Sequence, residues 1–333
     1  MSARKWTFIV LSIVSIISFG SFIFLYSIDT YNIRHPKAKK YYSEPNQRVM
    51  IIDYLLDKKH YSNYNSYIFG SSRVGYLNPF LIKDFKTYNM TYAEGLPHEH
   101  LLIIKFFLKN HIPIKHLLIG LDEFSYQVPF SRHDNQYGSK SHYLVTNTSL
   151  FEFYKFYFCH KPLKTDGKHF INKFIKHKTI KYSDKIYNEI YNQKKIYTNV
   201  EPPHNHNKEY EDNPRFSIPT PYVGMELKDT INDIKEIVRL AKQNDIELHI
   251  FINPIHHATY NFTSKPLLKE FKRQLKQIID YYDFTDPSFI SKDNGYWEDT
   301  SHYNINVGNM ILDTIYNHKK IDGFGKYIQK ETN

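Results

Sequence analysis

Cysteine is scarce in this chain, and its scarcity limits the chemistry that the protein can use. Cys159 is the one cysteine among 333 residues, so no disulfide can form within the chain. A zinc site held by several thiolates is excluded for the same reason. Hydrophobic residues make up 41 % of the chain, which is enough for a large buried core. The sequence therefore predicts a folded protein without an internal disulfide.

Recognisable nucleic-acid-binding motifs are also lacking, although the chain is basic. The formal net charge is +10, which suits an anionic partner such as an acidic glycan or lipid headgroups. The lysines are scattered along the chain, and this favours a generally basic, solvated surface. We therefore expect no nucleic acid partner.

The N-terminal segment carries the clearest physical signal. The run from Trp6 to Ile28 contains no charged residue, and as a helix it would span roughly 34 Å, enough to cross a bilayer. A cleaved signal peptide is the alternative. The apolar run is longer than such peptides usually have, and no A-x-A cleavage site follows it. The pattern favours an uncleaved, single-pass membrane anchor over residues 1–28.

The orientation of this anchor does not follow from flanking charge alone. Positive residues lie on both sides of the apolar run, namely Arg4, Lys5, Arg34, Lys37, Lys39 and Lys40. Because large domains translocate largely regardless of charge, we expect a short tail inside and the globular part outside. The protein would then be membrane-anchored with an extracytoplasmic domain, either periplasmic or on the cell surface.

Composition divides the rest of the chain into four parts. Residues 29–60 are polar and tyrosine-rich and are expected to form a stalk. Residues 61–122 and 226–325 are expected to form one α/β domain, and residues 326–333 a tail. Between the two halves, residues 123–225 form a polar insertion with a helix expected near 168–192. The insertion is either a lid or substrate platform, or a peripheral elaboration without function.

Strand and helix patterns alternate within the α/β part. The apolar runs 66–70, 115–122 and 247–254 predict buried strands, and 87–93 predicts a weaker one. Helix-period segments lie at 97–110, 227–243, 267–281 and 307–318. This alternation predicts a parallel sheet covered on both faces. Ligands of such folds bind at the carboxyl ends of the strands.

Candidate reactive residues follow these strands. Ser71 and Ser72 come after the first strand, Gly95 after the second, and Asp122 ends the third. Taken alone, two serines after a strand more often cap a helix than act as nucleophiles.

A second motif lies near the C-terminus, in a loop before the last helix. Asp299 and His302 stand three residues apart, a spacing that can put a carboxylate behind an imidazole. The carboxylate would then fix the tautomer and stabilise the imidazolium that forms when the ring accepts a serine proton. Either Ser71 or Ser72 could then act as the nucleophile. Together the two motifs predict a serine-dependent site.

The order of these motifs resembles the SGNH (GDSL-type) hydrolase superfamily over roughly residues 62–320, outside the insertion. "GSSR" follows a first strand, a glycine follows the second, "GLD" ends the third, and a D-x-x-H motif lies near the C-terminus. The resemblance is greatest to the membrane-anchored branch that includes the D-alanyl-transfer protein and the alginate O-acetylation proteins. It implies a three-layer, flavodoxin-like parallel sheet, SGNH hydrolase-like, carrying a large insertion and preceded by one N-terminal transmembrane helix.

The resemblance also assigns roles. Ser72 matches the nucleophile, His302 the general base and Asp299 the carboxylate that orients it. The oxyanion hole would use the backbone N–H groups of Ser72 and Gly95. The third donor of the family is an asparagine, and here Asp122 stands in its place.

An ionised carboxylate cannot donate to an oxyanion and would repel it. We therefore expect Asp122 to pair with Arg73 and to hold the loop. Losing one oxyanion donor can cost on the order of 100-fold in rate.

Several other residues are candidates for weaker roles. Ser71, Asn253, His256 and His257 are candidate substrate contacts, since all four lie at or just past the ends of expected strands; solvated loop histidines are the alternative for His256 and His257. The pairs His98/His100 and His204/His206 have metal-like spacing, but no carboxylate or thiol cluster accompanies either pair. The sequence therefore predicts no metal site and no cofactor.

The expected function is that of a serine O-acyl, most simply O-acetyl, transferase or esterase that acts on a cell-envelope polysaccharide or another acyl-bearing substrate. The resemblance suggests a membrane-bound O-acyltransferase as a partner that supplies the acyl group. The alternative is a non-catalytic protein that binds polysaccharide or forms the scaffold of an envelope export or modification complex.

Overall fold

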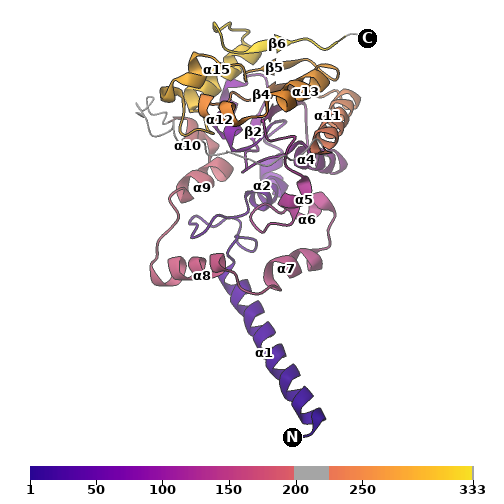
Figure 1. The fold of residues 1–333 in the computed structure, drawn as a ribbon, viewed down its shortest axis with the longest axis vertical. Helices are drawn as coiled ribbons and strands as arrows, with labels where there is room; N and C mark the ends of the chain where they lie inside the picture. The colour runs from indigo at the N-terminus through magenta and orange to yellow at the C-terminus, as the bar shows by residue number, and fades with distance from the viewer. Residues whose placement is uncertain (199–224, 332–333) are drawn as a thin grey trace. The chain divides into compact units, whose positions relative to one another are not determined.

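The computed structural model describes residues 1–198 and 225–331. The chain forms two compact units (Figure 1). The anchor unit contains Met1–Tyr54 and Asp134–Tyr187, and the α/β unit contains Leu55–His133 and Asn188–Asn333. Each unit therefore contains segments that are far apart in the sequence.

A mixed six-stranded sheet forms the centre of the α/β unit. Its strand order is β2-β1-β3-β4-β5-β6. Strands β1 to β5 are parallel, and β6 runs antiparallel to β5. The strands are β1 (Ser66–Phe69), β2 (Thr87–Asn89), β3 (His116–Leu121), β4 (Glu247–Ile252), β5 (Tyr281–Asp283) and β6 (Lys326–Ile328).

Both faces of the sheet are covered by helices, because alternate strand residues point to opposite faces. Ile68 and Phe251 are fully buried in a cluster with Ile311 of α15. On the other face, the ring of Tyr67 lies 5.0 Å from that of Phe107 in α4. The sheet is thus apolar on both sides, as the continuous hydrophobic runs predict.

The helices of the α/β unit surround this sheet. They are α3 (Lys58–Tyr61), α4 (Pro97–Lys109), α5 (Phe130–Asp134), α10 (Gln193–Thr198), α11 (Met225–Gln243), α12 (His257–Phe262), α13 (Lys265–Lys276), α14 (Phe289–Lys292) and α15 (Ile305–Tyr316). The short turns η1 (Ser72–Tyr76), η2 (Pro79–Leu81) and η4 (Asn294–Tyr296) lie between them. Helix α4 begins at Pro97, and the carboxylate of Glu99 accepts from the N–H of Leu96 at 2.8 Å, which satisfies a donor at the helix start.

The predicted strands and most of the predicted helices are present, but the C-terminal part differs from the expectation. The helix expected to reach residue 281 ends at Lys276, and Tyr281–Asp283 is strand β5. Gly323 and Gly325 adopt left-handed backbone angles (φ 67° and 80°) that favour glycine. The chain turns back there, and part of the expected tail becomes the antiparallel strand β6. The sheet is therefore mixed rather than wholly parallel.

The anchor unit is helical. Its elements are α1 (Ala3–Ile28), α6 (Tyr143–Thr146), α7 (Leu150–Phe158), α8 (Lys164–Phe170) and the π-helical turn η3 (Ile171–Ile175). Helices α2 (Gln47–Leu56) and α9 (Ser183–Tyr191) cross the boundaries between the two units. A continuous helix was expected over 168–192, but the chain leaves the helical path at His177, which has a positive φ of 49°.

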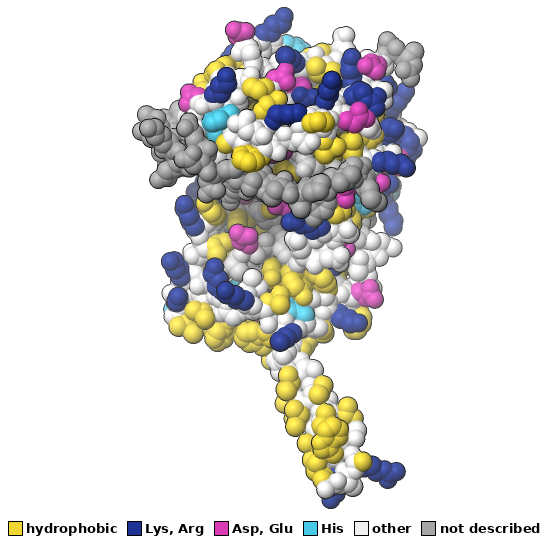
Figure 2. Space-filling view, viewed as in Figure 1, with side chains coloured by type: hydrophobic (Ala, Val, Ile, Leu, Met, Phe, Trp, Pro, Cys, Tyr) yellow, Lys and Arg dark blue, Asp and Glu magenta, His cyan; other side chains and the backbone are white. Residues whose placement is uncertain are grey.

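Helix α1 is long and apolar enough to cross a membrane. Figure 2 shows hydrophobic side chains along its surface, as a span facing lipid would need. Its last turn differs from the rest, since Leu25 and Ile28 are buried against Phe153 and Phe158 of α7. The last turn of α1 therefore packs against α7 within the anchor unit.

Residues 29–54 pack against later residues of this unit. The side-chain amide of Asn46 donates to the hydroxyl of Tyr157 at 2.8 Å and to the carbonyl of Lys140 at 2.7 Å. Residues 134–187 of the expected insertion thus fold together with the first 54 residues. Residues 188–198 belong to the α/β unit, and residues 199–224 lie outside the described part of the chain.

Candidate functional site

Ser72, His302 and Asp299 meet at the carboxyl edge of the sheet. Ser72 Oγ lies 2.7 Å from Nε2 of His302. Nδ1 of the same ring lies 3.0 Å from both carboxylate oxygens of Asp299. The side chains of His302 and Asp299 are 16 % and 24 % exposed, so solvent and small molecules can reach them. A hydroxyl, an imidazole and a carboxylate therefore lie in series within hydrogen-bonding reach, an arrangement compatible with acyl transfer by serine.

The loop that carries the histidine is shaped by its own hydrogen bonds. The carboxylate of Asp299 accepts from the backbone N–H groups of Ser301 and His302 at 2.8 and 2.9 Å. An antiparallel bridge between Trp297 and Tyr303 closes the loop. The D-x-x-H spacing thus forms a compact turn in which the carboxylate and the imidazole must lie side by side.

The serine occupies the first position of the short helical turn η1, directly after β1. Ser71 precedes it as the N-cap, and its side chain accepts from the N–H of Arg73. The side-chain amide of Asn89, at the end of β2, donates to the carbonyl groups of Val74 and Leu77 at 2.6 and 3.0 Å. Asn89 therefore holds the middle and the C-terminal end of the turn that begins with Ser72.

Gly95 lies close to this turn, as the sequence predicted. A Cβ atom at Gly95 would clash with the carbonyl of Gly70, so only glycine allows the two loops to approach this closely. Within the described residues, the backbone N–H groups of Ser72 and Gly95 have no hydrogen-bond acceptor. As the first residue of a helical turn, Ser72 has an N–H that is free to donate. Both groups are available to a ligand.

The predicted pairing of Arg73 with Asp122 is present, and a second carboxylate joins it. Nη1 of Arg73 donates to Asp122 Oδ1 at 2.8 Å, and both terminal nitrogens donate to Glu123. Nε donates to the carbonyl of Ser301 at 2.7 Å. Arg73 is 1 % exposed, so its guanidinium is enclosed by acceptors. This network ties η1 to the loop after β3 and to the loop that carries His302.

Electrostatics fit this structural role. Burial opposes the charge of Arg73, but Glu123 and Asp122 together outweigh burial and raise its pKa above the ordinary value. Burial is also the largest influence on Asp122 and raises the pKa of its carboxyl, while Arg73 acts in the opposite direction. One guanidinium faces two carboxylates, so the arginine stays charged. The Oδ1 atom of Asp122 is turned toward this network.

The four candidate substrate contacts are largely enclosed by protein. Asn253 is fully buried, donates to Asp122 Oδ1 at 3.0 Å and accepts from the hydroxyl of Tyr303 at 2.9 Å. His256 is also buried, with Nε2 2.9 Å from the side-chain oxygen of Asn294. Asn253 and His256 are thus buried and hydrogen-bonded to other protein side chains, contrary to the expectation that they face a substrate.

The remaining two candidates also contact protein. Ser71 is 1 % exposed and caps η1. His257 is half-buried, and its Nδ1 lies 3.1 Å from the carbonyl of Ser291. Ser71 is therefore closed to solvent, whereas His257 is partly exposed, as Ser72 and His302 are.

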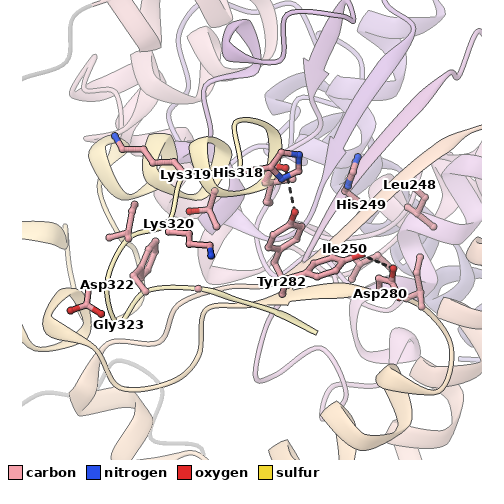
Figure 3. A pocket seen from close by; sticks show the side chains of 17 residues that line it. Leu248, His249, Ile250, Asp280, Tyr282, His318, Lys319, Lys320, Asp322 and Gly323 are labelled. Carbon is pink, nitrogen blue, oxygen red and sulfur yellow. Dashed lines mark hydrogen bonds between the residues drawn. The ribbon is translucent and has the colours of Figure 1, made fainter. Parts of the chain in front are cut away.

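Two cavities of the α/β unit lie apart from the triad. One has a volume of about 430 Å³ and is lined by residues next to Gly95, including Leu96, His98 and Ser125. The other has a volume of about 990 Å³ and is lined by His249, Tyr282 and Lys319 among others (Figure 3). The second cavity is near the amino ends of β4 and β5. Neither cavity is lined by Ser72.

One group with metal-ligand chemistry occurs among the described residues. It consists of His116, Glu247 and His249, whose ligand atoms lie within 4.8 Å of one another. His116 has hydrogen-bond partners on both ring nitrogens, Ser66 at 2.7 Å and Tyr316 at 2.8 Å. Burial lowers the pKa of His116 to about 3, and a neutral ring with two partners is a satisfied core histidine. The pair His204 and His206 lies outside the described residues.

Sequence reasoning missed several supporting residues. Glu123 stands next to Asp122, and its position in "GLDE" was the available signal. Asn89, Ser301 and Tyr303 have no motif that marks them, because their partners are remote in the sequence.

Neither a protein-family model nor a curated protein matches this chain.

Proposed function

We propose that the protein is a membrane-anchored, extracytoplasmic serine O-acyltransferase or esterase of the SGNH type, acting on a cell-envelope polysaccharide. The observation that carries the proposal is the chain of contacts from Ser72 through His302 to Asp299, at 2.7 and 3.0 Å. A second support is the pair of free N–H groups at Ser72 and Gly95, which can stabilise an oxyanion. The sheet with helices on both faces is compatible with a flavodoxin-like arrangement.

The proposed reaction has two steps. Ser72 Oγ attacks the acyl carbonyl carbon while Nε2 of His302 accepts the hydroxyl proton, and Asp299 stabilises the imidazolium. The tetrahedral intermediate breaks its bond to the leaving oxygen, which takes the proton and departs as an alcohol. A sugar hydroxyl or water then loses a proton to His302 and attacks the acyl-serine. The product ester or acid leaves, and the proton returns to Ser72.

Labelling with a fluorophosphonate probe tests the nucleophile in the full-length chain. We expect the wild-type protein to label and Ser72→Ala to lose labelling. Ser264→Ala is the matched control, because Ser264 is exposed and makes no cap hydrogen bond, and it should label like the wild type. Ser71→Ala should retain labelling. If Ser71→Ala loses labelling while Ser72→Ala keeps it, Ser71 is the nucleophile.

A non-catalytic, polysaccharide-binding protein is the second candidate. It is favoured by one observation, namely that Asp122 and Arg73 form a closed ion network where an oxyanion donor is expected. A wild-type chain that never labels with the probe but still retains acylated polysaccharide on a pull-down resin would support this candidate over the enzyme.

A further inference from the structure

The anchor unit exposes large hydrophobic side chains on two segments that do not span a membrane. Phe151 of α7 is 75 % exposed and Ile175 of η3 is 64 % exposed. We call the exposed set on these segments the collar. It consists of Leu150, Phe151, Leu163, Phe170, Ile171, Phe174 and Ile175. Exposed apolar side chains gathered in one region usually mark an interaction surface.

The collar lies beside the end of α1. Figure 1 shows α7 and α8 on either side of the last turns of that helix, and both helices contact it. The ring of Phe170 lies 5.8 Å from that of Phe24 in α1, and the ring of Phe158 lies 5.4 Å from that of Tyr26. Nζ of Lys173 donates to the carbonyl of Ile28, the last residue of α1, at 3.1 Å. The collar thus adjoins the end of α1, and Figure 2 shows hydrophobic side chains on the side of the anchor unit from which α1 emerges.

Charge around the collar is mostly positive, although Glu152 is exposed beside Phe151 on α7. Residues 161–182 contain one acidic residue, Asp166, which is buried and accepts from Thr30 Oγ1 at 2.7 Å. The same stretch contains Lys161, Lys164, Lys168, Lys173, Lys176, Lys178 and Lys181. Lysines beside apolar side chains can extend their ammonium groups to headgroups while the apolar groups enter the acyl region.

We infer that the collar sits in the headgroup and acyl boundary of the bilayer around the point where α1 emerges. The inference rests on α1 spanning the membrane, which is part of the proposed function. Its occupant is the lipid surface, because the collar adjoins the end of α1 and is flanked by lysines. Side chains at such a boundary are buried by about 5–10 Å. The collar would hold the anchor unit flat against the membrane rather than leaving it tethered at a distance.

Fluorescence quenching by brominated lipids tests this inference in the full-length chain. The background is Trp6→Phe, which leaves Trp297, a residue buried in the α/β core. Single tryptophans replace Phe174 in the collar, Val14 in the exposed middle of α1, and Phe289 on the exposed surface of the α/β unit. Each variant is reconstituted into two sets of phosphatidylcholine and phosphatidylglycerol vesicles, one brominated near the headgroup end of the acyl chains, to report on Phe174, and one near their terminal methyl groups, to report on Val14.

We expect the added tryptophan to lose most of its emission in Phe174→Trp and in Val14→Trp, and to keep it in Phe289→Trp. Quenching at Val14 without quenching at Phe174 would show that α1 spans the membrane and that the collar does not contact lipid. Absence of quenching at both positions would overturn both. All three sites are exposed, and unchanged Trp297 emission in the Trp6→Phe background shows that the fold is retained.

Discussion

Replacing Arg73 with methionine should destabilise the α/β unit far more than replacing either of its carboxylate partners. Arg73 is buried and donates to Asp122, Glu123 and the carbonyl of Ser301. Arg73→Met leaves two buried carboxylates without a counter-charge. Breaking a buried ion pair in this way costs about 3–5 kcal/mol of unfolding free energy.

The single carboxylate variants should behave differently, because the network holds one positive and two negative charges. Asp122→Asn leaves Arg73 paired with Glu123, and Glu123→Gln leaves it paired with Asp122. Each should cost about 1 kcal/mol, the usual net value of a hydrogen bond. The double variant leaves the guanidinium buried and unpaired, so it should cost about 3–5 kcal/mol. The two substitutions are then non-additive by roughly 1–3 kcal/mol.

Urea unfolding of the full-length chain in detergent measures these differences. Trp297 is buried in the core of the α/β unit, and with Trp6→Phe it is the remaining tryptophan, so its emission reports this unit. Arg239→Met is the matched control, since Arg239 pairs with Glu236 on an exposed helix surface, and surface pairs contribute little.

Additive costs in the carboxylate double variant would refute the three-charge account. So would an Arg73→Met protein as stable as the Arg239→Met control. Either result would mean that the guanidinium and the carboxylates do not share one buried network, and that Asp122 is free to act elsewhere in the site.

Three further changes test other parts of the protein. Gly308→Ala on α15 should cost about 1–3 kcal/mol in the same assay, because its Cβ would clash with a backbone carbonyl of η1. The hydrogen bond to Asp233 raises the pKa of His98 in the folded protein. The pair therefore stabilises the fold at pH values below the pKa of histidine in the unfolded chain, about 6.5, and this stabilisation is lost as the pH rises through the pKa of His98 in the folded protein. Asp233→Asn should therefore lower the melting temperature more at about pH 5.5 than at about pH 8.5, and equal effects would contradict the pairing. A cysteine at the exposed Lys242, in a cysteine-free background, should react with an impermeant maleimide on intact spheroplasts; reaction only after lysis would place the α/β unit in the cytoplasm.

Local sequence determined the parts of this protein that depend on near neighbours. The apolar run before residue 28 predicts a helix of membrane-spanning length, and the buried strands and most helices of the α/β unit follow from hydrophobic periodicity. The candidates Ser72, Asp299 and His302 were predictable as well. Their motifs follow a strand or precede a helix, and parallel strands bring such positions to one edge.

Tertiary structure decided what depends on partners far apart in the chain. Glu123 completes the network of Arg73 because β1 and β3 are neighbours in the sheet, and Asn89 holds the serine turn because β2 lies beside β1. The anchor unit is assembled from residues 1–54 and 134–187, which no local pattern links. Strand β6 reverses direction after two glycines and pairs with β5. Periodicity reports which face of an element is buried, whereas the identity of the residues that bury it follows from how distant segments fit together.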